Sequence, residues 1–82
     1  MKEWIIRVDG MMCSMCEAHV NDAIRRHVSV KKVASSHRKG EVRVVADAAT
    51  DEEQIFASIK SVGYRVLGYE ARPYKRRRLF GL

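Results

Sequence analysis

Apolar residues recur along this chain with two different periods, and the order of these periods limits the folds that it can adopt. The first period is two: in residues 3–9 every second position is apolar. This alternation predicts a strand with one buried face. The residues of that face are Trp4, Ile6 and Val8. Gly10 ends the run and permits a turn. From Ser14 to Val28 the spacing becomes three or four residues, which predicts an amphipathic helix of about four turns with Ser14 as its N-cap.

The middle of the chain predicts a hairpin. Residues 29–37 form a weakly alternating run, and the β-branched residues of 42–46 form a second, stronger run. The short loop Arg38-Lys39-Gly40 separates them. Two such runs around a glycine-containing loop are typical of paired antiparallel strands.

The last third of the chain predicts a second helix and a final strand. Thr50 to Glu53 form a capping box, in which the Thr50 side chain caps the amide of Glu53. The apolar residues that follow at helical spacing are Ile55, Phe56, Ile59 and Val62. Gly63 stands where helices often end in a glycine, and residues 64–69 are typical of a last strand.

The predicted order is strand, helix, strand, strand, helix, strand. This order defines the split βαβ or ferredoxin-like plan, an α+β fold (βαββαβ) with one four-stranded antiparallel sheet and both helices on one face. A chain of 82 residues forms one domain. Because Pro73 and the basic run after it do not suit a sheet, we expect the domain to occupy residues 1–71 and a disordered tail to occupy residues 72–82.

The positive charge of the chain is concentrated in this tail. The net charge is +6, from 16 Lys and Arg against 10 Asp and Glu. The tail holds five basic residues and no acid, namely Arg72, Lys75, Arg76, Arg77 and Arg78. Subtracting these five charges from six leaves the domain close to neutral, so we expect no nucleic acid as a partner. A weak contact with anionic membranes, at about 1 kcal/mol per basic residue, is the alternative to a solvated tail.

Residues 10–16, GMMCSMC, hold both cysteines of the chain and three of its four methionines. The sequence has no apolar run near the roughly 20 residues that span a bilayer and no signal-peptide pattern, so we expect a cytoplasmic protein with reduced thiols. In that compartment a C-x-x-C pair is typical of metal binding or redox chemistry. Cys13 falls in the predicted loop and Cys16 in the first helical turn, where free amides and the helix dipole favour thiolates.

The number of ligands narrows the choice of metal. Thiolates select Cu(I), zinc and iron–sulfur clusters, but structural zinc and these clusters normally require four ligands. With two cysteines in the chain, a soft ion held between two sulfurs fits best. We therefore expect Cu(I), with Ag(I), Hg(II) or Zn(II) as alternatives.

The pattern Gly10-Met11-x-Cys13-x-x-Cys16, placed between the first strand and the first helix of a βαββαβ chain, resembles the heavy-metal-associated domain family. That family includes cytosolic copper chaperones and N-terminal domains of metal-pumping P-type ATPases. The resemblance covers about residues 3–70 and implies that Cys13 and Cys16 are the metal ligands. It also implies that Met11 points into the core and that Tyr64 lies beside the metal site, where bacterial copper chaperones often carry tyrosine.

Position 12 departs from the family pattern. Family members usually have threonine or serine there, and zinc or cadmium transporting members often have aspartate. Met12 removes that hard oxygen ligand, which favours copper. Met12 and Met15 are interpreted as flexible fillers or an apolar docking rim, with a third, weak thioether ligand as the alternative. His19 is interpreted as a solvated helix residue, although one helical turn past Cys16 it is placed to ligate or tune the thiolate.

The resemblance implies a function in binding and transfer, not an enzyme. We expect a cytosolic Cu(I) chaperone, a monomer that passes the ion to a P-type ATPase or its metal-binding domain, with a metal-bridged dimer as an alternative. A thiol–disulfide oxidoreductase also carries C-x-x-C at a helix start, but here Ser14-Met15 stand between the cysteines in place of the Gly-Pro pair of thioredoxins. A zinc- or mercury-binding module or a metal sensor is a further alternative.

Overall fold

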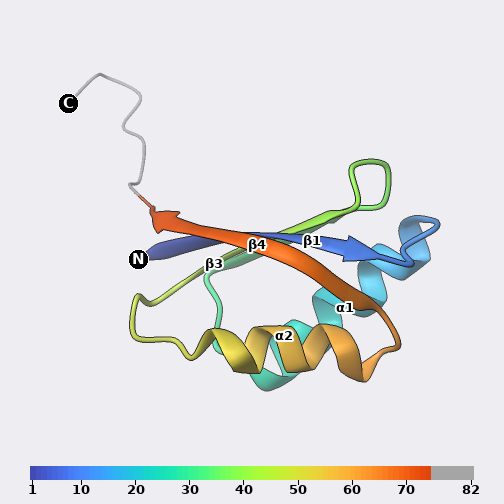
Figure 1. Cartoon of the computed structure of the whole chain (residues 1–82). Coiled ribbons are helices and arrows are strands. Elements are labelled where there is room, and N and C mark those ends of the chain that lie inside the picture. Colours follow the sequence, from blue (N-terminus) through green and yellow to red (C-terminus); the bar gives the residue numbers. More distant parts are fainter. Residues whose placement is uncertain (75–82) are drawn as a thin grey trace, which may run out of the picture.

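The computed structural model describes residues 1–74, which form one sheet packed against one layer of two helices (Figure 1). The elements in chain order are β1 (Lys2–Asp9), α1 (Ser14–His27), β2 (Lys32–Ser36), β3 (Glu41–Ala46), α2 (Glu52–Ser61) and β4 (Arg65–Pro73). This is the predicted βαββαβ order. All neighbouring strands are antiparallel, and the sheet order is β2-β3-β1-β4, so the ferredoxin-like fold is confirmed.

The central position of β1 explains where the core lies. The predicted inward face of β1 points at the helices, and Trp4 is fully buried there, with its indole N–H donating to Glu52 at 3.1 Å. Trp4 is therefore a core residue in a central strand. Its largest fully buried partners are Ile6, Val20, Ile24, Val42, Val44, Ile55 and Ile59.

Both helices begin one residue away from the predicted caps. The N-cap of α1 is Cys13, and Ser14 is the first helical residue with no capping hydrogen bond. The N-cap of α2 is Asp51, whose side chain accepts from the Glu53 amide at 3.0 Å. Thr50 is held outside the helix because its own amide donates to Asp47 in the preceding turn (2.9 Å). The predicted caps were therefore wrong. The carboxylate of Asp51 caps α2 at least as effectively as a threonine hydroxyl would, and its negative charge also suits the helix dipole.

The ends of two strands also differ from expectation. The first hairpin strand begins at Lys32, three residues later than predicted, which fits its weak alternation. Strand β4 continues to Pro73, four residues past the strand predicted at residues 64–69 and two past the expected end of the domain at residue 71. Pro73 is tolerated because β4 is an edge strand, where a missing N–H breaks no ladder on the outer side. Of the tail predicted at residues 72–82, residues 72 and 73 belong to β4, and residues 75–82 lie outside the described residues.

Gly63 follows α2 with a φ of +92°, the left-handed conformation expected for a C-cap glycine. None of the helices in residues 1–74 is long and apolar enough to cross a membrane.

Candidate metal centre

The loop between β1 and α1 is shaped by a glycine under an aromatic ring. Gly10 has a φ of +111°, a conformation that side chains rarely adopt. A Cβ at this position would also lie 2.9 Å from Cδ1 of Tyr64. Glycine is therefore required here for two reasons, the backbone conformation of the turn and the closeness of the Tyr64 ring. Tyr64, in the loop after α2, lies directly against the cysteine loop, as the resemblance implied.

Met11 fixes the loop to the body of the domain. Its side chain is buried in the core cluster with an exposed fraction of 8%. The expectation that Met11 serves the core is thus confirmed. The chain then returns to the surface, so that Cys13 is exposed and Cys16 is half-buried at the start of α1.

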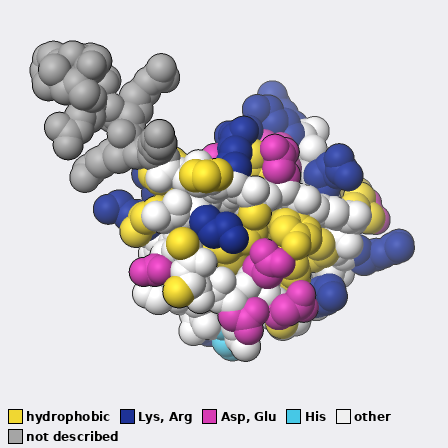
Figure 2. All heavy atoms as spheres, turned by 60° about the vertical axis from the view of Figure 1, so that its left-hand side comes forward, with side chains coloured by type: hydrophobic (Ala, Val, Ile, Leu, Met, Phe, Trp, Pro, Cys, Tyr) yellow, Lys and Arg dark blue, Asp and Glu magenta, His cyan; other side chains and the backbone are white. Residues whose placement is uncertain are grey.

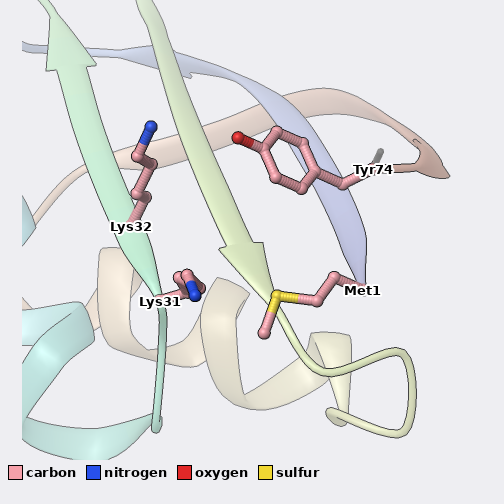
Figure 3. Close-up of a pocket in the computed structure, with 4 residues that line it drawn as sticks. All are labelled: Met1, Lys31, Lys32 and Tyr74. Atoms are coloured by element: carbon pink, nitrogen blue, oxygen red, sulfur yellow. The ribbon is translucent and has the colours of Figure 1, made fainter. Parts of the chain in front are cut away.

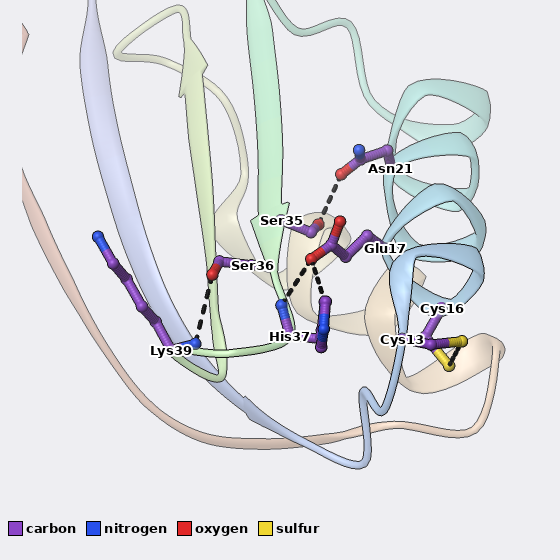
Figure 4. A network of polar contacts seen from close by, with 8 residues as sticks. All are labelled: Cys13, Cys16, Glu17, Asn21, Ser35, Ser36, His37 and Lys39. Carbon is purple, nitrogen blue, oxygen red and sulfur yellow. Dashed lines mark hydrogen bonds and ion pairs between the residues drawn. The ribbon is translucent and has the colours of Figure 1, made fainter.

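The two cysteines are free thiols whose sulfurs lie 4.0 Å apart (Figure 4). A disulfide would need about 2.05 Å. Two metal–sulfur bonds of about 2.3 Å to one ion allow sulfur separations from about 3.8 Å at a tetrahedral angle to about 4.6 Å at a linear one. The observed separation falls inside this range, so one ion fits between the sulfurs with little movement of the loop.

The start of α1 makes Cys16 a good thiolate. Its pKa is lowered to about 7, first by a hydrogen bond from the Met12 amide and then by one from the Tyr64 hydroxyl. The same hydrogen bond raises the pKa of Tyr64. The first turn also bonds back to the N-cap, because the amides of Cys16 and Glu17 donate to the Cys13 carbonyl at 3.0 and 3.3 Å. Near neutral pH a large part of Cys16 is therefore ionised and able to bind a metal.

The other residues singled out in the sequence are exposed. Met12 and Met15 are 82% and 67% exposed, so neither fills the core. His19 is exposed on α1. Within residues 1–74, no three Cys, His, Asp or Glu side chains are grouped closely enough to hold an ion.

One network near the site was not predicted (Figure 4). Glu17 is the neighbour of Cys16 in the sequence. Its Oε2 accepts a hydrogen bond from the His37 amide at 2.8 Å and lies 2.6 Å from Nδ1 of the His37 ring. The amide is the first cause of a lowered Glu17 pKa. One turn along α1, Asn21 accepts from Ser35 at 2.6 Å.

These two contacts fasten the helix that carries Cys16 to the β2–β3 hairpin. They join residues 14 and 20 positions apart. No local pattern in the sequence signals such pairs, because the packing of α1 against the hairpin decides which residues meet.

Comparisons with known proteins agree on the family of this chain. The chain matches the family profile of the heavy-metal-associated domain over residues 5–65. It is 28% identical over 72 residues to a mercuric reductase of Serratia marcescens, a match that covers 88% of this chain and 16% of that protein. The chain thus spans less than a fifth of the length of the curated relatives it matches.

Two solved structures are similar over nearly their whole length. The CopZ metallochaperone is 27% identical with a TM-score of 0.75, covering 79% of this chain and 98% of that one. A copper binding domain from HMA7, a P-type ATPase, is 27% identical with a TM-score of 0.73, covering 85% and 99%. The profile match over most of the chain, the shared fold and the cysteine loop lead to one conclusion: this chain belongs to the heavy-metal-associated domain family.

Proposed function

We propose that this protein carries Cu(I) on the thiolates of Cys13 and Cys16 and hands it to a second metal-binding protein. The observation that carries the proposal is the exposed pair of free thiols, 4.0 Å apart, at the start of α1. The lowered pKa of Cys16 supports it, because the thiolate is the form that binds metal. A soft ion with two sulfur ligands suits this donor set better than an ion that needs four.

The proposed partner is a metal-transporting P-type ATPase or its metal-binding domain. Similarity to CopZ and to a P-type ATPase domain supports this choice. Transfer requires the partner's thiolates to reach the ion while Cys13 still holds it, and the exposure of Cys13 favours this. We propose a monomer in the cytoplasm, where thiols remain reduced. A weak contact of the basic tail with anionic membranes belongs to the same proposal.

Hg(II) is the second candidate cargo, because the similar curated proteins are mercuric reductases. It accepts the same soft, two-sulfur site. An oxidoreductase function is less well supported, since the chain belongs to a metal-binding family and its two thiols are separated by Ser14-Met15.

The test is an anaerobic competition titration of the reduced protein. Cu(I) is titrated against a bicinchoninate-type chelator, and Zn(II) and Hg(II) are titrated in parallel. We expect one tightly bound Cu(I) per chain and weak zinc binding. Zinc affinity equal to or above that of Cu(I) would overturn the copper assignment.

The matched control is the double variant Cys13→Ser, Cys16→Ser, which keeps the size and polarity of the loop. It should fold normally and bind no Cu(I) tightly, because neither side chain belongs to the core cluster's fully buried set. An insulin reduction assay on the same samples checks the redox alternative. Turnover by the wild type that the double variant lacks would support an oxidoreductase.

A further inference from the structure

The end of the sheet farthest from the cysteines carries a hollow of about 280 Å³ lined by Met1, Lys31, Lys32 and Tyr74 (Figure 3). We call it the basic hollow. It lies where β1 and β2 begin and β4 ends. Backbone hydrogen bonds hold its rim, from the Tyr74 amide to the Met1 carbonyl (2.9 Å) and from the Lys31 amide to the Val45 carbonyl (2.7 Å).

The hollow opens on the face of the sheet that the helices do not cover. Lys32 and Glu3 both pair with Val45 in the register, on the face opposite to Trp4. Val45 is 3% exposed although it points away from the helices. The side chains at this end of the outer face therefore cover an apolar position, while Met1 is 53% exposed.

The charge on this side is positive and unneutralised. Lys31 and Lys32 are exposed, and neither forms an ion pair within the part of the chain that the structure describes. Glu3, the acid of β1 on the same face, is already paired with Arg72 at 3.2 Å. In the sequence, four consecutive basic residues follow directly after Tyr74.

Besides Glu3, and Asp47 directly after β3, the acids of this end lie on the helix side. They belong to the first turn of α2 and its N-cap, at Asp51, Glu52 and Glu53. Figure 2 views the molecule from this end, with Lys and Arg mainly in its upper part and Asp and Glu gathered mainly below. An anionic surface is therefore attracted by the sheet side and repelled by the start of α2.

We propose that the basic hollow is a docking surface for the anionic lipid headgroups of a membrane. Exposed cations around apolar side chains are the composition that binds at such interfaces, and tyrosine is enriched there. A nucleic acid is a poorer match, since single-stranded binding relies on a platform of several aromatic rings and the hollow has one. This inference goes beyond metal carriage and does not depend on which metal is bound.

Docking here leaves the metal loop free. The eight residues of β1 separate the hollow from Gly10 and the cysteines, which is roughly 25 Å at the rise of a strand. A chain bound through the hollow keeps Cys13 and Cys16 at the other end of the sheet, open to a partner protein beside the membrane.

The experiment is co-sedimentation of the full 82-residue chain with vesicles of phosphatidylcholine, alone or with phosphatidylglycerol. The test variant is Lys31→Gln, Lys32→Gln, at the start of β2. The matched control is Arg38→Gln, Lys39→Gln, which removes the same charge from exposed residues just past the end of the same strand. Thermal unfolding confirms that both variants fold.

We expect binding to the anionic vesicles alone, weakened by salt, and an about 30-fold loss in the Lys31/Lys32 variant from about 1 kcal/mol per lysine. The Arg38/Lys39 variant should lose about threefold or less. Equal losses in the two variants, or none in the first, would overturn the proposal in favour of the tail or of net charge. Binding to a labelled DNA duplex in preference to vesicles, at equal salt, would overturn the choice of lipid.

A second measurement tests the orientation. A bulky maleimide reagent should react with Cys13 and Cys16 at the same rate with and without anionic vesicles. Protection of the thiols by vesicles would contradict docking through the hollow, whatever metal the protein carries.

Discussion

The N-cap of helix α1 is Cys13 and that of helix α2 is Asp51, and the free amides of the first helical turn are used differently at the two helix starts. At α2 the Asp51 carboxylate accepts from the Glu53 amide, and two further acids follow in the first turn. At α1 no side chain caps the helix, and the chain supplies sulfur instead. Amides around that start, the Met12 amide first, lower the pKa of Cys16.

The same local feature, a helix start with free amides, therefore serves two purposes in this chain. Free amides at a helix start stabilise negative charge. Where that charge is a fixed carboxylate, the helix becomes more stable. Where it is an exposed thiolate, the helix forgoes a cap worth about 1 kcal/mol and gains a reactive, metal-binding sulfur.

The largest effect is expected from Cys13→Ser. The backbone of Cys13 is extended (φ −160°, ψ 178°), as at ordinary N-caps. Serine there should abolish tight Cu(I) binding because one thiolate remains. The apo protein should keep its stability or gain up to about 1 kcal/mol from the new cap. Chelator competition and thermal unfolding measure the two effects, and a large fall in the unfolding temperature would show that the cysteine is structural.

A smaller effect is expected from Asp51→Ala. Loss of the cap should cost about 1 kcal/mol, a fall of roughly 4–8 °C in the unfolding temperature for a domain of this size. Cu(I) affinity should not change, because the start of α2 contacts Trp4 near the beginning of β1, whereas the cysteine loop follows the end of that strand. Thr50→Ala is the matched control and should have little effect, since Thr50 lies outside the helix. A larger loss from Thr50→Ala than from Asp51→Ala would restore the capping box predicted from the sequence.

The smallest effect is expected from Tyr64→Phe, which removes the hydroxyl and keeps the ring over Gly10. Because the Tyr64 hydroxyl is a secondary cause of the lowered Cys16 pKa, that pKa should rise from about 7 by a fraction of a unit. The thiolate is the reactive form, so alkylation of Cys16 at pH 7 should slow by about threefold or less.

In a Cys13→Ser background, Cys16 is the remaining thiol. The pH profile of its alkylation is recorded with and without Tyr64→Phe. The midpoint should move to higher pH. Cu(I) affinity of the single variant Tyr64→Phe should change only modestly. A loss as large as that of Cys13→Ser would make the hydroxyl a direct participant in holding the ion.

Much of the fold and of the candidate site was predictable from the sequence because it depends on short-range patterns. The alternation around Trp4 predicted a strand, the helical spacing after Ser14 predicted a helix, and the order of six elements predicted the sheet. The cysteine spacing and the resemblance indicated the loop and the buried Met11. The caps were misplaced by one residue, since Ser14, Thr50 and Asp51 all have side chains that cap and the sequence does not rank them.

The periods, the turn at Gly10 and the two thiols depend on residues that are close in the chain, so they could be recognised without the structure. Which distant groups contact them depends on how the helices, strands and loops pack together. Tyr64 reaches Cys16 across 48 positions, Glu17 meets His37 across 20, and Lys31 and Lys32 meet Tyr74 at one end of the sheet. These groups meet because the helices and loops pack against one sheet, whose strand order and register follow from burying one common core.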